Sequence, residues 1–172
     1  MNMEKMTSAY ANKMLRSLEE DKTYWVNKEA SSCTYVASLN EEPVIPEYDY
    51  AAVAATIEEL DGKIAIIKHA LNVTNATAKV QVGEVTMSVD TILIKMAQLN
   101  RRKSVLDMMR KQLPKAREEQ HYVSRNAVPE YRYINYDLEL IKQEYERVSS
   151  SIMEMQMALD KYNQTVEFEV NI

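Results

Sequence analysis

Glycine, histidine and cysteine are scarce in this sequence, and each scarcity excludes a class of functional site. The 172 residues include two glycines, two histidines and one cysteine. Walker loops and dinucleotide-binding fingerprints need several glycines, because the backbone must approach phosphate closely there. The histidines and the thiol are too few for the usual zinc sites, and no Gly-x-Ser-x-Gly elbow exposes a serine nucleophile. We therefore predict a protein that is not an enzyme and has no cofactor.

One pair of residues has a spacing known from metal proteins. Glu118 and His121 form Glu-x-x-His, which places two ligands on one face of a helix in di-iron bundles. Such sites need two copies of the motif and two further glutamates. The other histidine, His69, has no glutamate three residues before it. We interpret the motif as accidental and predict no metal site.

The single cysteine and the absence of long apolar runs indicate where the chain resides. Cys33 can form no internal disulfide, so a reducing cytoplasm is the simplest location, with the thiol buried or idle. The N-terminal stretch lacks an apolar run of signal-peptide length, and no segment approaches the roughly 20 apolar residues of a membrane helix. We expect an unexported, cytoplasmic chain with no membrane partner.

Length and composition indicate a helical globular chain. A chain of 172 residues fits one domain, residues 1–172, with a real core. Four prolines and two glycines among many Met, Leu, Ala, Glu and Lys residues predict long helices. The net charge of −5 argues against a general nucleic-acid or anionic-membrane binder, because such proteins gain affinity from a positive field.

Apolar periodicity places four helices. The first is expected at about 8–30, capped by Thr7 or Ser8, and the second begins after Asp49. The third runs from a Ser88 cap to about residue 113, since Pro114 ends or kinks it. The fourth begins at Asn135 or Asp137. Apolar residues three and four apart form seams in the second helix (Val53, Ile57, Leu60, Ile64, Ile67, Leu71) and the fourth (Leu138, Ile141, Tyr145, Val148, Ile152, Met155, Leu159, Tyr162).

Alternating residues predict short strands. Valines on both sides of Gly83-Glu84 indicate a β-hairpin with a type II′ turn, and a further short strand is expected at 33–37. We predict that residues 130–134 pair with residues 165–170, which brings Arg132 near Glu167 or Glu169 and sets Tyr131 and Tyr133 against Val166 and Phe168. The alternative role for these tyrosines is a platform for stacking bases, which the acidic neighbours disfavour.

These elements predict an α+β fold that is mostly α. We expect an elongated long-helix bundle with coiled-coil-like hairpins, a β-hairpin and short accessory strands. The seams can be buried within one chain or can join two copies. We predict self-association, with a homodimer as the first expectation. The candidate oligomer seam on the fourth helix comprises Ile141, Tyr145, Val148, Ile152, Met155 and Leu159.

Residues 101–117 hold the one basic concentration in the sequence, with Asp107 as its single acid. Residues seven apart share a flank of a helix, so phosphate or an acidic partner is a candidate ligand. The alternative is a solvated or salt-bridged helix face. The candidate residues for binding an anion or a partner are Lys103, Arg110, Lys111 and Arg117.

Methionines form a second candidate surface, because their side chains repack easily against different partners. The alternative is that they fill the core. The residues concerned are Met108, Met109, Met153, Met155 and Met157.

Three stretches resemble a known group of proteins: "PEYDYAAVAATIEELDGKIAIIKHALNVTN", "TMSVDTILIKMAQLNRRKSVLDMMRKQLPKARE" and "EYRYINYDLE…MALDKYNQTVEFEV". In the order and spacing of these features the chain is similar to an uncharacterised helical family common in Firmicutes and, more distantly, to septicolysin-like bacterial proteins. The resemblance covers most of residues 45–172. It implies a small helical protein with accessory strands and no established activity, and it assigns no functional residue. The septicolysin label implies a haemolysin.

The functional prediction is a non-enzymatic helical interaction or scaffold protein that self-associates through its heptad seams. One alternative is an accessory factor that binds nucleic acid or another anion through the basic helix at 101–117. A lytic, membrane-active protein is a further alternative, on the family name only. A nucleic-acid partner is not expected.

Overall fold

The computed structural model describes residues 3–118 and 128–172. By packing, the chain divides into two compact units. The first consists of Met1–Ala78 with Asp160–Ile172, and the second of Lys79–Leu159. The expectation of a single domain, residues 1–172, stays a prediction.

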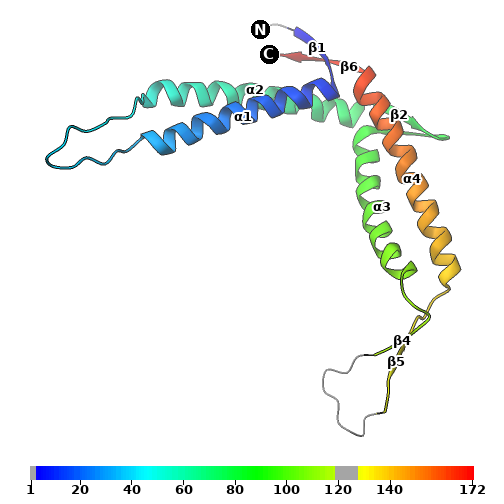
Figure 1. The fold of residues 1–172 in the computed structure, drawn as a ribbon. Coiled ribbons are helices and arrows are strands. Elements are labelled where there is room, and N and C mark those ends of the chain that lie inside the picture. Colours follow the sequence, from blue (N-terminus) through cyan, green and yellow to red (C-terminus); the bar gives the residue numbers. More distant parts are fainter. Residues whose placement is uncertain (1–2, 119–127) are drawn as a thin grey trace. The chain divides into compact units, whose positions relative to one another are not determined.

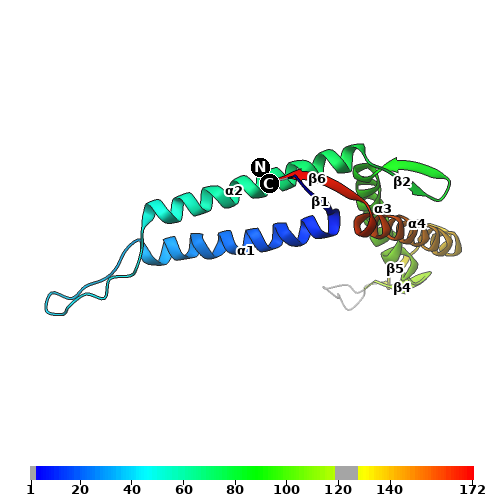
Figure 2. The same ribbon diagram turned by 90° about the horizontal axis from the view of Figure 1, so that it is seen from above.

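Two long antiparallel helices form the body of the first unit. Helices α1 (Ser8–Ser32) and α2 (Tyr50–Thr77) lie side by side along their length (Figures 1 and 2). The expected caps are confirmed, because Thr7 Oγ1 accepts from Tyr10 N and Asp49 Oδ1 from Ala52 N, each at 3.2 Å. Ion pairs between the helices, such as Lys68 to Glu19 at 2.7 Å, add cross-links on the exposed side.

A two-stranded sheet covers one end of this helix pair. Strands β1 (Met3–Thr7) and β6 (Glu167–Asn171) are antiparallel, with Lys5 opposite Glu169 and Met6 opposite Phe168. The predicted alternation in β6 is confirmed, since Val170 is buried whereas Glu167 and Glu169 are exposed. The core below the sheet consists of Met6, Ala11, Leu15, Ile64, Ile67, Leu71 and Val170.

The predicted partner of β6 was wrong. Residues 165–170 do not pair with residues 130–134, because the N-terminal strand β1 takes that place. Lys5 Nζ, not Arg132, lies 3.7 Å from Glu169. In β1 only Met6 is buried, so the sequence of this strand carries little of the alternation by which strands are found. The pairing is stabilised because it places Met6 of β1 and Val170 of β6 in the core with α1 and α2.

The strand predicted at 33–37 was also wrong. Residues 34–49, all of which the structure describes, form no strand and connect α1 to α2 as a long loop beyond the helix ends (Figure 2). A strand needs a partner for its backbone hydrogen bonds, and none pairs with this segment in the described parts of the chain. The loop is held at its end by Tyr48, whose hydroxyl donates to Glu29 Oε1 at 3.2 Å.

The predicted β-hairpin opens the second unit. Strands β2 (Lys79–Val82) and β3 (Val85–Ser88) pair with Val80 opposite Met87 and Val82 opposite Val85. Gly83 has φ +56°, whereas Glu84 keeps a negative φ. This combination fits glycine at the first position of a type II′ turn and not a type I′ turn, which needs positive φ at both positions.

Helices α3 (Val89–Arg110) and α4 (Leu138–Thr165) form the second helix pair (Figure 1). Ser88 is the N-cap of α3 as predicted, although its hydroxyl bonds the side chains of Asp90 and Thr91. Asp137 caps α4, since its Oδ1 accepts from the N–H groups of Glu139 and Leu140 at 2.8 and 3.2 Å. Helix α3 ends slightly earlier than expected, before Pro114.

The core of this second pair follows the predicted seam of α4. Ile141 and Val148 are buried with Leu106 of α3 in one apolar cluster. Tyr145 and Ile152 pack against that cluster as half-buried side chains. The hydroxyl of Tyr136 donates to Met109 O at 2.7 Å, in addition to the backbone N–H of Gln112, which donates to the same carbonyl at 3.1 Å.

A third two-stranded sheet links the ends of α3 and α4. Strands β4 (Lys115–Arg117) and β5 (Tyr131–Tyr133) are antiparallel. This is the pairing that residues 131–133 make in place of the predicted one. The fold class is confirmed: the protein is a mostly helical α+β chain with four helices in pairs and small two-stranded antiparallel sheets. Within residues 3–118 and 128–172, no helix combines the length and the apolar character that crossing a membrane requires.

Candidate functional site

The β4–β5 ribbon presents two tyrosines and two cations on one face. Lys115 lies opposite Tyr133, and Arg117 opposite Tyr131. Because opposite residues of an antiparallel pair share a face, and residues two apart along a strand do so as well, these four side chains lie on the same side of the ribbon. We call them the basic-aromatic face.

The side chains of the basic-aromatic face are exposed and in contact with one another. Tyr131 is 45% exposed and Tyr133 61%. The ammonium group of Lys115 lies 4.2 Å from the ring centroid of Tyr131 and 5.5 Å from that of Tyr133. These distances are typical of cation–π contacts. The lysine therefore stays beside the rings with its charge open to solvent.

The carboxylates of the ribbon lie on its opposite face. Glu118 binds Arg132 through two bonds, Nε to Oε2 at 2.8 Å and Nη2 to Oε1 at 2.5 Å. This guanidinium lowers the pKa of the Glu118 carboxyl. Glu130, two residues before Arg132, belongs to that same side by alternation. Among the described residues of the ribbon, the face with Lys115 and Arg117 therefore carries no carboxylate.

The other basic candidates gather around Tyr145. Lys103 Nζ and Arg110 Cζ lie 5.4 and 4.0 Å from the centroid of this ring. Arg110 also donates from Nε to Asp107 Oδ1 at 2.8 Å, and Lys111 pairs with the other carboxylate oxygen. Lys111, and then Arg110, lower the pKa of the Asp107 carboxyl.

The structure therefore separates the four residues that the sequence singled out for anion or partner binding. Lys103, Arg110 and Lys111 are close together on the α3–α4 pair, whereas Arg117 belongs to the ribbon. A shallow hollow of about 200 Å³ near the first group is lined by Arg110, Lys111, Lys142, Tyr145 and Glu146. The salt-bridged alternative describes Arg110 and Lys111, since Asp107 binds both.

The candidate oligomer seam of α4 is largely covered by other residues of the same chain. Ile141, Val148 and Leu159 are buried, and the three other seam residues, Tyr145, Ile152 and Met155, are half-buried. Contact between two copies through this seam stays a prediction. The methionine candidates divide in the same way: Met109 packs against the α3–α4 cluster, whereas Met108, Met153 and Met157 are exposed.

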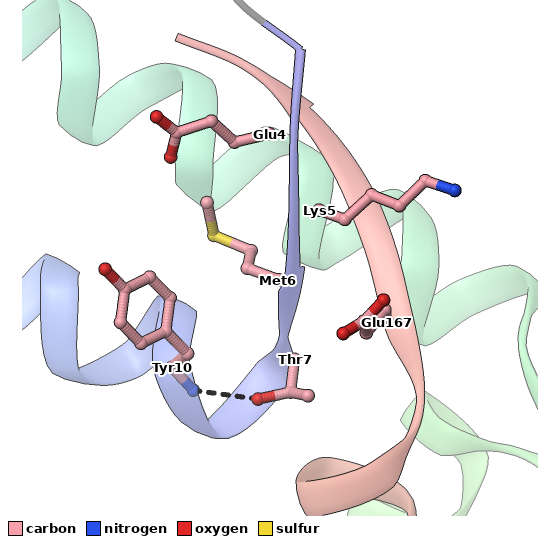
Figure 3. A pocket seen from close by; sticks show the side chains of 6 residues that line it. All are labelled: Glu4, Lys5, Met6, Thr7, Tyr10 and Glu167. Atoms are coloured by element: carbon pink, nitrogen blue, oxygen red, sulfur yellow. Dashed lines mark hydrogen bonds between the residues drawn. The ribbon is translucent and has the colours of Figure 1, made fainter.

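An open hollow of about 450 Å³ lies beside β1, and Figure 3 shows the side chains of the residues that line it. The lining residues are Glu4, Lys5, Met6, Thr7, Tyr10 and Glu167, and the side chains of Glu4 and Lys5 extend to opposite sides of β1 (Figure 3). The described residues contain no group of three His, Cys, Asp or Glu side chains placed to hold a metal ion. Of the Glu-x-x-His pair, Glu118 binds Arg132, and His121 lies outside the described residues.

The loop between α1 and α2 holds the most exposed apolar side chains of the described residues, and the sequence analysis did not single them out. Val36, Leu39 and Val44 are 99%, 104% and 90% exposed, and Tyr35 and Ile45 exceed one half. Residues 33–48 include three glutamates and no lysine or arginine. Pro43 and Pro46 follow residues 33–37, so they gave no signal against the strand predicted there. The thiol of Cys33, at the start of the loop, is exposed and not buried.

Comparison with known proteins identifies a fold and no activity. No family model matches the chain, and no curated protein matches it. The chain is similar in structure to a functionally unknown conserved protein from Corynebacterium diphtheriae, with a TM-score of 0.65 and 15% sequence identity. The similarity covers 96% of this chain and 99% of that one. The arrangement of helices and strands is therefore shared with a bacterial protein whose function is unknown, and neither of the suggested family names is confirmed.

Proposed function

We propose that the protein is a non-enzymatic scaffold that self-associates. The observation that carries the proposal is the set of large apolar side chains that project from the α1–α2 loop. Val36, Leu39 and Val44 are at least nine-tenths exposed. Scattered exposed apolar residues are ordinary, but contiguous ones mark interaction sites. Here they follow one another within a single short segment.

The helix seams support an interaction surface outside the helix pairs. Ile64 and Ile67 of α2, and Ile141 and Val148 of α4, are already buried inside the chain. Side chains that are buried in this way offer no further apolar area to a second copy. Burial of apolar surface contributes roughly 25 cal/mol per Å² to the free energy of association. Because the apolar side chains of the loop are still exposed, burying them between two copies contributes more of this free energy than the seams can.

Light scattering on a sizing column tests the proposal. At tens of micromolar we expect the native chain to elute as a multimer of its 19.9 kDa mass. The triple variant Val36→Ser, Leu39→Ser, Val44→Ser should elute as a monomer, because it removes the apolar contact without touching a buried residue. A native chain that stays monomeric at high micromolar concentration refutes self-association.

A matched control uses exposed apolar side chains elsewhere. Leu140, Met153 and Met157 on α4 are 61%, 64% and 67% exposed, and replacing the three by glutamine keeps helix propensity. We expect this variant to associate as the native chain does. If it dissociates and the loop variant does not, the methionine surface of α4 joins the copies and the loop does not.

Anion binding near Tyr145 is a second candidate function. Three cations, Arg110, Lys111 and Lys142, line one shallow hollow there. Binding by such a group should weaken steeply as salt increases. Affinity for a short single-stranded oligonucleotide at low salt, lost in Arg110→Glu, supports this function, and no binding at low salt refutes it. The lytic activity implied by the septicolysin-like resemblance has no supporting observation here, and we do not propose it.

A further inference from the structure

We propose that the segment Glu41–Glu47 of one copy docks on the basic-aromatic face of a second copy. This inference rests on the proposed self-association and names the two surfaces that meet. Each copy carries one docking segment and one basic-aromatic face. Two copies can therefore exchange segments in a closed dimer, and more copies can close a ring.

The docking segment has the sequence EEPVIPE. Pro43 and Pro46 each fix φ near −65°, and proline also keeps the preceding residue extended, so the segment favours polyproline II. With three residues per turn, Pro43 and Pro46 lie on one side of such a helix. At about 3.1 Å per residue they are roughly 9 Å apart. The structure gives residues 42–49 no helix or strand that competes with this conformation.

The receiving surface has complementary shape and chemistry. Polyproline segments dock on surfaces lined by aromatic side chains, where a preformed extended backbone loses little entropy on binding. Tyr131 and Tyr133 are two residues apart on β5, about 7 Å at the usual rise of a strand. Two exposed rings at this spacing can receive two prolines roughly 9 Å apart.

Charge supports a second copy as the occupant. The docking segment contributes Glu41, Glu42 and Glu47 with no cation among its residues. The receiving face contributes Lys115 and Arg117 with no carboxylate among the described ribbon residues on that side. Opposite charges at an interface accelerate association and exclude wrong partners. Nucleic acid is the other ligand that a surface of cations and tyrosines can bind, but the chain as a whole has net charge −5, which opposes it.

Reciprocal charge reversal tests the proposal. A loop-reversed variant carries Glu41→Lys, Glu42→Lys and Glu47→Lys, and a ribbon-reversed variant carries Lys115→Glu and Arg117→Glu. All five side chains are exposed, so both variants should fold. Each alone should associate at least tenfold more weakly than the native chain, because like charges then face one another. An equimolar mixture should recover association to within about threefold, because every contact again joins opposite charges.

Matched controls separate this contact from a general effect of net charge. Lys13→Glu with Arg16→Glu on α1 changes the charge as the ribbon-reversed variant does, and both residues are exposed. Glu20→Lys, Asp21→Lys and Glu58→Lys match the loop-reversed variant at exposed helix positions. We expect neither control to change the dissociation constant by more than about threefold, and mixing the two controls should have no effect.

The possible failures are distinguishable from one another. If the native chain never associates, the proposed function fails. If it associates, and both reversed variants associate equally well while the Val36, Leu39 and Val44 variant does not, the scaffold function stands and this docking mode is refuted. If the ribbon-reversed variant associates normally but loses binding of a single-stranded oligonucleotide that the native chain binds, the face binds nucleic acid. If the mixture does not recover association, the segment and the face do not meet between copies.

Discussion

The two glycines of the chain should respond in opposite directions to the same substitution. Gly62 lies in the middle of α2, and a Cβ added there would meet no described atom within 4 Å apart from its chain neighbours and the adjacent helix backbone. Glycine in an exposed helix interior costs up to about 1 kcal/mol relative to alanine. Gly62→Ala should therefore stabilise the first unit by about 0.5–1 kcal/mol, partly by restricting the unfolded chain.

Gly83→Ala should instead destabilise the second unit. Its φ of +56° is a conformation that costs an alanine roughly 1–2 kcal/mol. The new Cβ would also lie 2.7 Å from Glu154 Oε1. That oxygen is the end of a flexible, exposed side chain, so it can rotate away at little cost. The double variant Gly83→Ala, Glu154→Ala should consequently lose about as much stability as Gly83→Ala alone.

Urea unfolding measures both effects. The fluorescence of Trp25, the one tryptophan, reports on α1 and its unit, whereas far-ultraviolet circular dichroism reports on the whole chain. With a slope of about 2 kcal/mol per M, a change of 1 kcal/mol moves the midpoint by about 0.5 M. A neutral or stabilising Gly83→Ala refutes the turn conformation. A destabilising Gly62→Ala shows that the position is packed against a neighbour.

Three further predictions test the packing, an ion pair and the loop. Leu106→Ala should lower the free energy of unfolding by about 2–5 kcal/mol, because the side chain is 0% exposed in the α3–α4 cluster. The neighbouring Val105→Ala, at a 41% exposed position, should lower it far less. Thermal unfolding of both variants checks this difference. Lys111 lowers the pKa of Asp107. The contribution of the Asp107 carboxylate to stability is therefore present above the unfolded pKa of about 3.9 and is lost as pH falls through the lower, folded value. An NMR titration that finds the pKa of Asp107 at or above 3.9 contradicts this. Cys33 is exposed, so the native chain should react with a thiol reagent about as fast as the urea-unfolded chain, and strong protection contradicts the exposed loop start.

The elements that were predicted correctly depend on signals within a few residues. Thr7, Asp49 and Asp137 each accept a bond from a backbone N–H two or three positions later, and this geometry follows from residue type and local spacing. The seam of α4 was predictable for the same reason, since residues three and four apart on a helix share a face. The hairpin turn at Gly83 was predictable in the same way, because its signal consists of the glycine and the two short strands that flank it.

The pairings that were predicted wrongly depend on contacts between distant segments. Residues 131–133 and 167–171 both alternate, and alternation alone cannot say which strand either one joins. Each paired instead with a short strand of weak pattern, residues 115–117 and 3–7. The candidate site was divided for a related reason: the end of α3 and the change to a strand place Arg117 on a different surface from Arg110.

The location of the proposed contacts follows from how the chain uses its apolar residues. A long helix with a heptad seam must bury that seam in something. Here the seams of α2 and α4 are largely covered within the pairs α1–α2 and α3–α4 of one chain. The connections between the paired helices stay exposed. One is an acidic, proline-containing loop, and the other is a basic ribbon with two tyrosines. Connections tolerate variation without loss of the core and commonly carry recognition. Because these two connections are opposite in charge, a partner that satisfies both is available in every solution of the protein, namely another copy of the same chain.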